Sequence, residues 1–154
     1  MASEQYIRGA VRSADVIIGA MMTAGQRSPV LVTEDMVRSM RPGSVIVDAV
    51  IDQGGCIETS RITTVSDPVY TLHNVIHYCV PNMPALVSRT ASYGLTNASL
   101  DYILNIADNS LTNALMADEG LAKGVCTYKG ICTNEFIANS FDLDYKKIHV
   151  FSTN

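Results

Sequence analysis

The sequence of 154 residues predicts an α/β fold, in which a parallel sheet is followed by a long helix. Three short apolar segments, at residues 15–20, 44–48 and 75–80, have the composition of buried strands. A loop and a helix join the first two, as in a right-handed βαβ crossover. Further along, apolar residues recur at helical spacing over residues 91–107.

The first half of the chain contains the predicted sheet. A short helix is expected at residues 4–13, before the first strand. Thr33 is a good N-cap for a helix at Glu34–Met40, which Arg41-Pro42-Gly43 ends. The apolar side of that helix consists of Met36, Val37 and Met40. Residues 57–74 have a mixed character that predicts no element.

The stretch Ser44–Cys56 is central to the interpretation. Val45, Ile46 and Val47 in succession suit a strand that is buried on both faces. Asp52 follows the strand, and the glycine pair Gly54-Gly55 allows the backbone to bend there. Taken alone, Asp52 is a turn residue or a site residue, and the stretch by itself favours the turn.

The second half of the chain is predicted to be mainly helical. The long helix at residues 91–107 is followed by a second at Leu111–Met116. A small hairpin is expected between Val125–Tyr128 and Ile131, with Gly130 in its turn. Thr133 is expected to cap a last short helix, Asn134–Asn139.

Composition excludes several classes of protein. The net charge of -4 argues against a nucleic-acid surface. No apolar run approaches the ~20 residues of a membrane span, and no signal-peptide pattern opens the chain, so a cytoplasmic location is expected. None of the four cysteines forms a C-x-x-C pair. Cys79 is predicted to be a small buried hydrophobe, and Cys56 an ordinary small residue rather than a reactive thiol.

The three predicted strands end near Ala20, Asp48 and Val80. Carboxyl ends of parallel strands meet at one edge of a sheet, where ligands bind, so their convergence predicts a binding site. A dinucleotide fold normally has six strands and a G-x-G-x-x-G turn. This chain has three predicted strands and no such turn. It therefore has the pattern of the second half of a Rossmann-like sheet.

Several motifs in order suggest a family. The sequence resembles the C-terminal portion of NAD-dependent L-alanine dehydrogenase, within the alanine dehydrogenase and transhydrogenase family, from about residue 9 to about residue 143. The motifs that carry the resemblance are Ala14–Ala20, Met40–Asp48, Ile51–Cys56, Ser60-Arg61, His77–Val80, Asn82–Pro84, Leu95–Ala98, Leu121–Val125 and Tyr128–Gly130. The resemblance implies that residues 1–88 are the C-terminal half of an NAD-binding domain, and that residues 89–154 comprise a connecting helix and the end of a substrate domain.

The resemblance also implies the reaction and the site. Such enzymes oxidise L-alanine to pyruvate and ammonium with NAD and are usually homohexamers. Asp52 matches the catalytic acid, and Asn82 matches a position that faces the substrate as well as the cofactor. The positions implied for cofactor binding are Met21, Met22, Ala49, Val50, Ile51, Asp52, Arg61, Val80, Pro81, Asn82 and Met83. The family's catalytic histidine and lysine, and its substrate-binding arginine, belong to an N-terminal domain that this chain lacks.

Some positions depart from the family pattern. Ala24 and Ile62 stand where prolines are usual, and Pro81 replaces an alanine and stiffens the loop before Asn82. Asn105 and Asn109 occupy positions that hold metal ligands in some members, so no metal is predicted. The three histidines, His73, His77 and His149, are interpreted as structural, and His77 as a hydrogen-bonded residue within a strand.

Three interpretations remain open on the sequence. In the first, the chain is the C-terminal portion of an alanine dehydrogenase and is inactive without its missing half. The second is the NAD-binding subunit of a proton-translocating transhydrogenase, against which Ile51-Asp52-Gln53 argues. The third is a non-enzymatic, truncated chain, because the glycine turn that anchors the pyrophosphate is absent.

Overall fold

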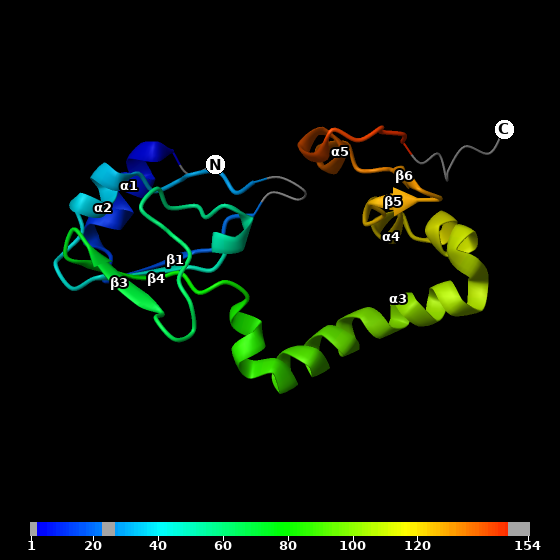
Figure 1. The fold of residues 1–154 in the computed structure, drawn as a ribbon, viewed down its shortest axis with the longest axis horizontal. Coiled ribbons are helices and arrows are strands. Elements are labelled where there is room, and N and C mark those ends of the chain that lie inside the picture. The colour runs from blue at the N-terminus through cyan, green and yellow to red at the C-terminus, as the bar shows by residue number, and fades with distance from the viewer. Residues whose placement is uncertain (1–2, 23–26, 148–154) are drawn as a thin grey trace. The chain divides into compact units, whose positions relative to one another are not determined.

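The computed structural model describes residues 3–22 and 27–147. The chain divides into two compact units, Met1–Leu86 and Val87–Asn154, which we call the sheet unit and the helical unit (Figure 1). The sequence placed a domain limit between residues 88 and 89, and that assignment of domains stays a prediction. Ala24, His149 and the end of the chain from residue 148 lie outside the described residues.

The sheet unit is built on one four-stranded sheet with strand order β1-β2-β4-β3. β1, β2 and β4 run parallel to one another, whereas β3 is antiparallel to β4. The four strands are β1 (Val16–Gly19), β2 (Val45–Asp48), β3 (Val69–Leu72) and β4 (Val75–Tyr78). The three predicted strands and their parallel pairing are therefore confirmed.

The count of three strands was wrong, because β3 lies within the segment that predicted no element. Its partner is β4, to which it is joined by the two-residue turn His73-Asn74. Both turn residues have positive φ, 53° and 61°, as two-residue hairpins of type I′ require. His-Asn lacks the glycine that usually marks such a turn, so the sequence signal for the hairpin was weak.

Two helices cover one face of the sheet (Figure 1). They are α1 (Glu4–Ser13) and α2 (Glu34–Arg38), and the side chain of Thr33 caps α2 by accepting a hydrogen bond from the N–H of Met36 (3.4 Å). The predicted helices and this cap are confirmed. The core between helices and sheet consists of Val11, Val32, Met36, Val37, Met40, Ile46, Val50, Cys56, Ile57 and Val75.

The opposite face of the sheet is open, which corrects the prediction that β2 is buried on both faces. Ile46 is fully buried under the helices, whereas Val45 and Val47 are only half-buried. Their partners on β1, Val16 and Ile18, are 56% and 69% exposed. Within the described part of the sheet unit, no helix packs on this face. The apolar residues there lack the cover that a two-sided parallel sheet normally has.

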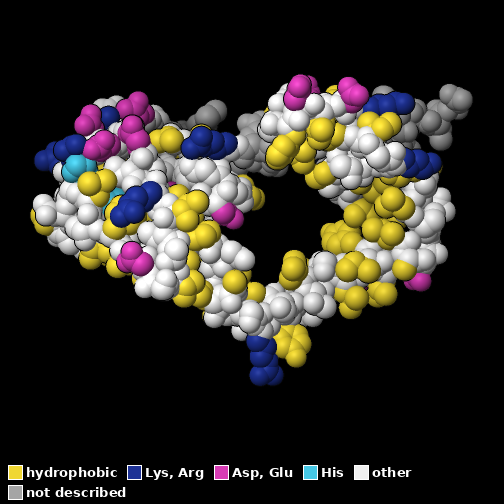
Figure 2. All heavy atoms as spheres, viewed as in Figure 1, with side chains coloured by type: hydrophobic (Ala, Val, Ile, Leu, Met, Phe, Trp, Pro, Cys, Tyr) yellow, Lys and Arg dark blue, Asp and Glu magenta, His cyan; other side chains and the backbone are white. Residues whose placement is uncertain are grey.

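The helical unit is dominated by α3 (Ser88–Ala117), which contains a break at Ser110 (φ 67°, ψ 155°). The break separates the two helices that the sequence predicted at residues 91–107 and 111–116. Figure 2 shows hydrophobic side chains open on the surface along this unit. Large hydrophobic side chains that are exposed on α3 include Leu95, Leu100, Ile103 and Leu104.

The rest of the helical unit is a small hairpin between two short helices. The predicted hairpin is confirmed as β5 (Thr127–Tyr128) and β6 (Ile131–Cys132). The last helix is α5 (Glu135–Phe141), and its N-cap is Asn134 rather than Thr133, whose hydroxyl donates to the carbonyl of Val125 (2.8 Å). After α3, where Gly120 and Gly124 in the sequence predict only a turn, the chain forms a further helix, α4 (Glu119–Lys123).

Among the described residues, no helix is both long and apolar enough to cross a membrane.

Candidate active site

The carboxyl ends of the three parallel strands meet at one edge of the sheet. Gly19 at the end of β1 is in register with Asp48 at the end of β2, and Val47 pairs with Tyr78 at the end of β4. The prediction that these three ends lie together is therefore confirmed. This is the edge at which open parallel sheets bind ligands.

The segment after β2 carries Asp52 to this edge. Ile51–Gln53 form a short 3₁₀ turn in which Ile51 is buried and Asp52 is exposed. Gly54 and Gly55 follow with φ of 102° and 70°, so the predicted glycine bend is confirmed. Of the other expected site residues here, Val50 is buried, whereas Ala49 is exposed.

Asp48, which the sequence predicts only as the end of a strand, is a further residue of this edge. Its carboxylate is fully buried and accepts hydrogen bonds from the N–H groups of Val50 (3.3 Å) and Cys56 (3.2 Å). These two groups lie at the two ends of the segment that holds Asp52. The sequence signal for this burial was the spacing of Asp48, which lies two residues after Ile46. Both side chains are therefore on the covered face of β2.

The segment after β1 contacts the segment after β2. The N–H of Ser28 donates to the carbonyl of Gln53 (2.9 Å), and the side chain of Arg27 lies where a Cβ on Gly54 would be. Arg27 thus lies beside the turn that holds Asp52, a position that no sequence pattern indicated. Met21 and Met22, expected to face the cofactor, are 45% and 60% exposed.

The segment after β4 turns sharply. Val80 is buried and Pro81 half-buried, while Asn82 is exposed and has φ of 51°. The carbonyl of Asn82 accepts from the N–H of Ala85 (2.9 Å), within the turn that leads to η2 (Met83–Val87). Asn82 therefore acts as a turn former, and its side chain remains accessible at the sheet edge.

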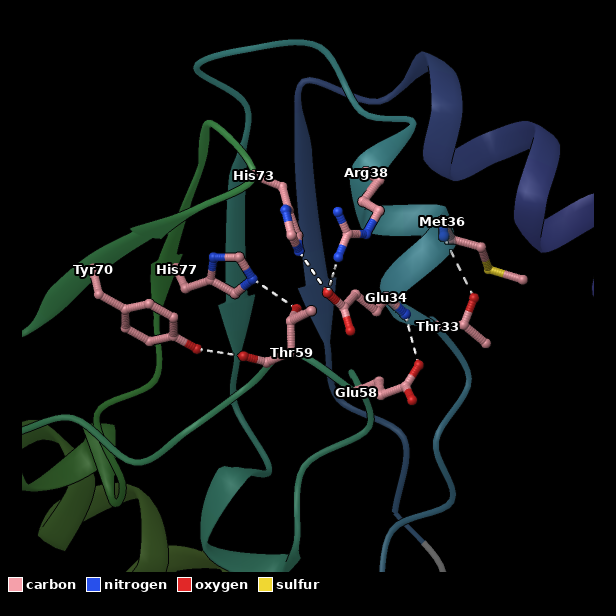
Figure 3. A network of polar contacts seen from close by, with 9 residues as sticks. All are labelled: Thr33, Glu34, Met36, Arg38, Glu58, Thr59, Tyr70, His73 and His77. Atoms are coloured by element: carbon pink, nitrogen blue, oxygen red, sulfur yellow. Dashed lines mark hydrogen bonds and ion pairs between the residues drawn. The ribbon is translucent and has the colours of Figure 1, made fainter.

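Arg61 is held against an aromatic cluster. Its guanidinium lies over the ring of Tyr70 at 4.2 Å, and the backbone N–H of Arg61 donates to the Tyr70 hydroxyl (3.0 Å). That hydroxyl donates to the carbonyl of Thr59 (2.7 Å), as Figure 3 shows. Burial raises the pKa of Tyr70 to about 12, so the phenol stays protonated and keeps this bond at neutral pH.

His77 lies beneath Tyr70, with ring centroids 4.8 Å apart. Its Nδ1 donates to the carbonyl of Val75 (3.0 Å), so in the neutral ring Nε2 accepts from the hydroxyl of Thr59 (2.8 Å; Figure 3). Burial lowers the pKa of His77. The prediction of a hydrogen-bonded structural histidine is confirmed.

A second polar network lies at the opposite edge of the sheet, by the turn between β3 and β4. The Glu34 carboxylate binds His73 Nε2 (2.7 Å) and Arg38, and Glu58 accepts from the N–H of Glu34 (2.7 Å; Figure 3). The bond to His73 is the largest cause that lowers the pKa of Glu34. This network joins α2 to the turn between β3 and β4 and to Glu58. Because it lies away from the carboxyl ends of the parallel strands, it is no part of the candidate site.

The cysteines do not form a reactive centre in the sheet unit. Cys56 and Cys79 are both buried, and desolvation raises the pKa of the Cys56 thiol, which disfavours the nucleophilic thiolate. Within residues 3–22 and 27–147, no group of three or more His, Cys, Asp or Glu side chains could hold a metal ion. The two asparagines that the sequence resemblance placed at possible metal-ligand positions bind each other, since Asn109 Nδ2 donates to Asn105 Oδ1 (2.8 Å).

Comparison with known proteins identifies the family. Residues 1–135 match the alanine dehydrogenase/PNT C-terminal domain. The chain belongs to this family. It is 50% identical over 138 residues to alanine dehydrogenase 1 of Staphylococcus aureus, in strains NCTC 8325 and MRSA252 alike, covering 90% of this chain and 37% of each relative. The chain thus spans about a third of the length of the curated relatives that it matches.

Solved structures agree. An L-alanine dehydrogenase superposes with a TM-score of 0.74 at 40% identity, over 92% of this chain and 39% of that one. A transhydrogenase from Sinorhizobium meliloti gives a TM-score of 0.58 at 23% identity, over 73% of this chain and 32% of that one. The second likeness shows the fold alone. The predicted resemblance to the C-terminal portion of alanine dehydrogenase is confirmed, and the transhydrogenase alternative is the weaker of the two.

Proposed function

We propose that this chain is the C-terminal portion of an NAD-dependent L-alanine dehydrogenase, which converts L-alanine to pyruvate and ammonium. The observation that carries the proposal is the position of Asp52. It is an exposed carboxylate on a glycine-bent turn at the edge where three parallel strands end, in a chain of the alanine dehydrogenase family. As part of the same proposal, the enzyme is cytoplasmic and homohexameric.

The residues present fit one end of a dinucleotide. The exposed residues Ala49, Asp52 and Asn82 lie just beyond the ends of β2 and β4, where a nicotinamide ring would bind. The other proposed cofactor contacts are Met21, Met22, Val50, Ile51, Arg61, Val80, Pro81 and Met83. NAD, when bound, supplies the hydride acceptor for the α-carbon of alanine. The glycine-rich turn that would hold its pyrophosphate is absent from this sequence.

The proposed role of Asp52 is proton transfer and charge stabilisation. Once the substrate ammonium group has lost a proton, loss of hydride from the α-carbon leaves a cationic imine, which a nearby carboxylate stabilises. Water then adds to the imine carbon and gives a proton to Asp52, which passes it to the amine nitrogen. The C–N bond then breaks as the carbonyl forms, and the hydroxyl proton leaves with the ammonia, which gives pyruvate and ammonium. Asn82 is proposed to donate a hydrogen bond to the carboxylate or carbonyl oxygen of the substrate.

The missing cover of the sheet supports a further part of the proposal, a need for a partner segment. β1 is an edge strand in the described sheet, and its own apolar side chains Val16 and Ile18 are exposed. Exposed apolar faces of this kind are normally covered. We propose that the N-terminal portion of the enzyme, which relatives possess, supplies the further strands, the glycine-rich turn and the remaining catalytic residues.

Two preparations test the proposal. One is the 154-residue chain alone, and the other is a chimera in which the N-terminal portion of S. aureus alanine dehydrogenase 1 precedes this chain. We expect the chain alone to bind NAD weakly by calorimetry and to form no NADH from L-alanine, whereas the chimera forms NADH. Turnover by the isolated chain would contradict the need for a partner, and an inactive, folded chimera would favour the non-enzymatic interpretation.

The role of Asp52 is tested in the chimera. Asp52→Asn should lower kcat by about 10²–10⁴-fold, the contribution typical of a general acid or base, while the Kd for NAD changes little. Asp67→Asn, at another exposed carboxylate of the sheet unit, is the matched control and should leave both values unchanged. Equal losses of kcat and NAD affinity in Asp52→Asn would indicate a structural turn residue instead.

A further inference from the structure

The buried carboxylate of Asp48 holds the segment that carries Asp52. One oxygen, Oδ1, accepts from the N–H of Val50 at 3.3 Å, and the other, Oδ2, accepts from the N–H of Cys56 at 3.2 Å. Val50 precedes the 3₁₀ turn that contains Asp52, and Cys56 follows the glycine bend. One side chain therefore binds both ends of the segment between residues 50 and 56.

We propose that Asp48 is a positioning residue for Asp52, acting through these two backbone hydrogen bonds rather than by contact with substrate. This inference rests on the proposed function, because it assigns Asp48 to the same reaction. A carboxylate that is displaced by about 1 Å from its productive position can lose about 10²-fold in rate. A segment that is bent twice at glycines needs a rigid anchor to avoid such a displacement.

The chemistry of the contacts requires an acid at this position. Both partners are N–H donors, so the side chain must accept with both oxygens, which a carboxylate can do and an amide cannot. The side chain is fully buried, and no ion pair with Lys or Arg involves Asp48 among the described residues. A buried, unpaired carboxylate is costly. The hydrogen bonds from the two N–H groups therefore stabilise the buried carboxylate, and the carboxylate fixes the positions of these two groups.

The surrounding glycines make room for this arrangement. A Cβ on Gly55 would lie 2.9 Å from Oδ2 of Asp48, and a Cβ on Gly19 would lie 2.6 Å from Sγ of Cys56. Gly55 also has φ of 70°. The end of β1, the end of β2 and the return of the segment at Cys56 therefore pack around one carboxylate.

The test uses Asp48→Asn and Gly55→Ala in the chimera described above. Asp48→Asn places an NH₂ group against one of the two N–H donors, and Gly55→Ala pushes a methyl group against Oδ2. We expect kcat to fall about 10–100-fold in both variants, with the KM for NAD changed by less than about threefold. Gly43→Ala is the matched control, because Gly43 also has positive φ (85°) but open space around it, and it should retain kcat.

Amide hydrogen exchange in the 154-residue chain separates positioning from loss of fold. In Asp48→Asn, the amides of Val50 and Cys56 should exchange faster, while the amides of Val45 and Val47 within β2 keep their protection. Faster exchange throughout the sheet would mean a purely structural role and would overturn the proposal. An unchanged kcat in the variants of an active chimera would also overturn the positioning role of Asp48, while the proposed function would stand. An inactive, folded parent chimera would overturn both.

Discussion

The two units of the chain are stabilised in different ways. The sheet unit has a core in which side chains from α1, α2, β2 and β4 are buried together, with Met36, Ile46 and Val75 fully inaccessible. In the helical unit, the buried side chains among residues 87–147 are few and mostly small, namely Ala114, Leu115, Cys132 and Ala138. Along α3, Leu95 is 72% and Ile103 58% exposed.

This difference indicates where each unit obtains its stability. The sheet unit depends on contacts between segments that are far apart in the sequence, so it should unfold as a whole. The long helix depends mainly on its own backbone hydrogen bonds and local propensities, which alone make a helix only marginally stable. Three measurements would sharpen or break this comparison.

The largest expected effect is that of a cavity in the sheet unit. Ile46→Ala removes a fully buried side chain and should lower the free energy of unfolding by about 2–5 kcal/mol, as measured from the slowest-exchanging amides of β2. Leu104→Ala, at a half-exposed position on α3, is the control and should change stability by less than about 0.5 kcal/mol. Similar losses at the two positions would show that α3 is as tightly packed as the sheet.

A smaller effect is expected from pH, again in the sheet unit. Burial holds the pKa of His77 below its usual value of 6.5, so below that pH the unfolded chain binds a proton that the folded chain does not. Stability should therefore fall as pH decreases from 7.5 to 5.5, by at most about 1.4 kcal/mol per pH unit for one proton. Urea unfolding at several pH values would measure the slope.

His77→Phe supplies the comparison for this prediction. The variant keeps an aromatic ring beneath Tyr70 but cannot take up a proton, so its stability should depend less on pH over the same interval. Identical slopes in the variant and the parent chain would contradict a buried neutral histidine.

The smallest effect is a gain of stability in the helical unit. Gly94 lies inside α3, and a Cβ there would meet no atom within 4 Å. Gly94→Ala should stabilise the helix by up to about 1 kcal/mol, because alanine loses less backbone entropy on folding. Slower exchange of the neighbouring α3 amides, with unchanged exchange in β2, would be the expected result. Unchanged exchange in α3 would argue that this helix is held by packing rather than by local propensity.

The contrast between Asp48 and Asp52 illustrates the limits of a sequence pattern. Both acids follow apolar residues near the end of β2, and Asp52 was distinguished by the glycine pair that follows it and by the family resemblance. The fold makes them different, since Asp48 lies in phase with Ile46 on the covered face, whereas Asp52 lies on the exposed turn beyond the strand. The elements that cover one face of the sheet bury Asp48, whereas Asp52, on the turn beyond the strand, stays accessible.

The sequence by itself determined the parallel strands, the capped helix α2, the glycine bend and the long helix, because these depend on local propensity, apolar periodicity and turn chemistry. Only the tertiary structure decided that β3 pairs with β4 through a turn without glycine, that one face of β2 is open, and that Asp48 binds both ends of the Asp52 segment. Each of these depends on contacts between residues that are distant in the chain or on the cover that other elements provide, and such contacts leave little trace in a local pattern.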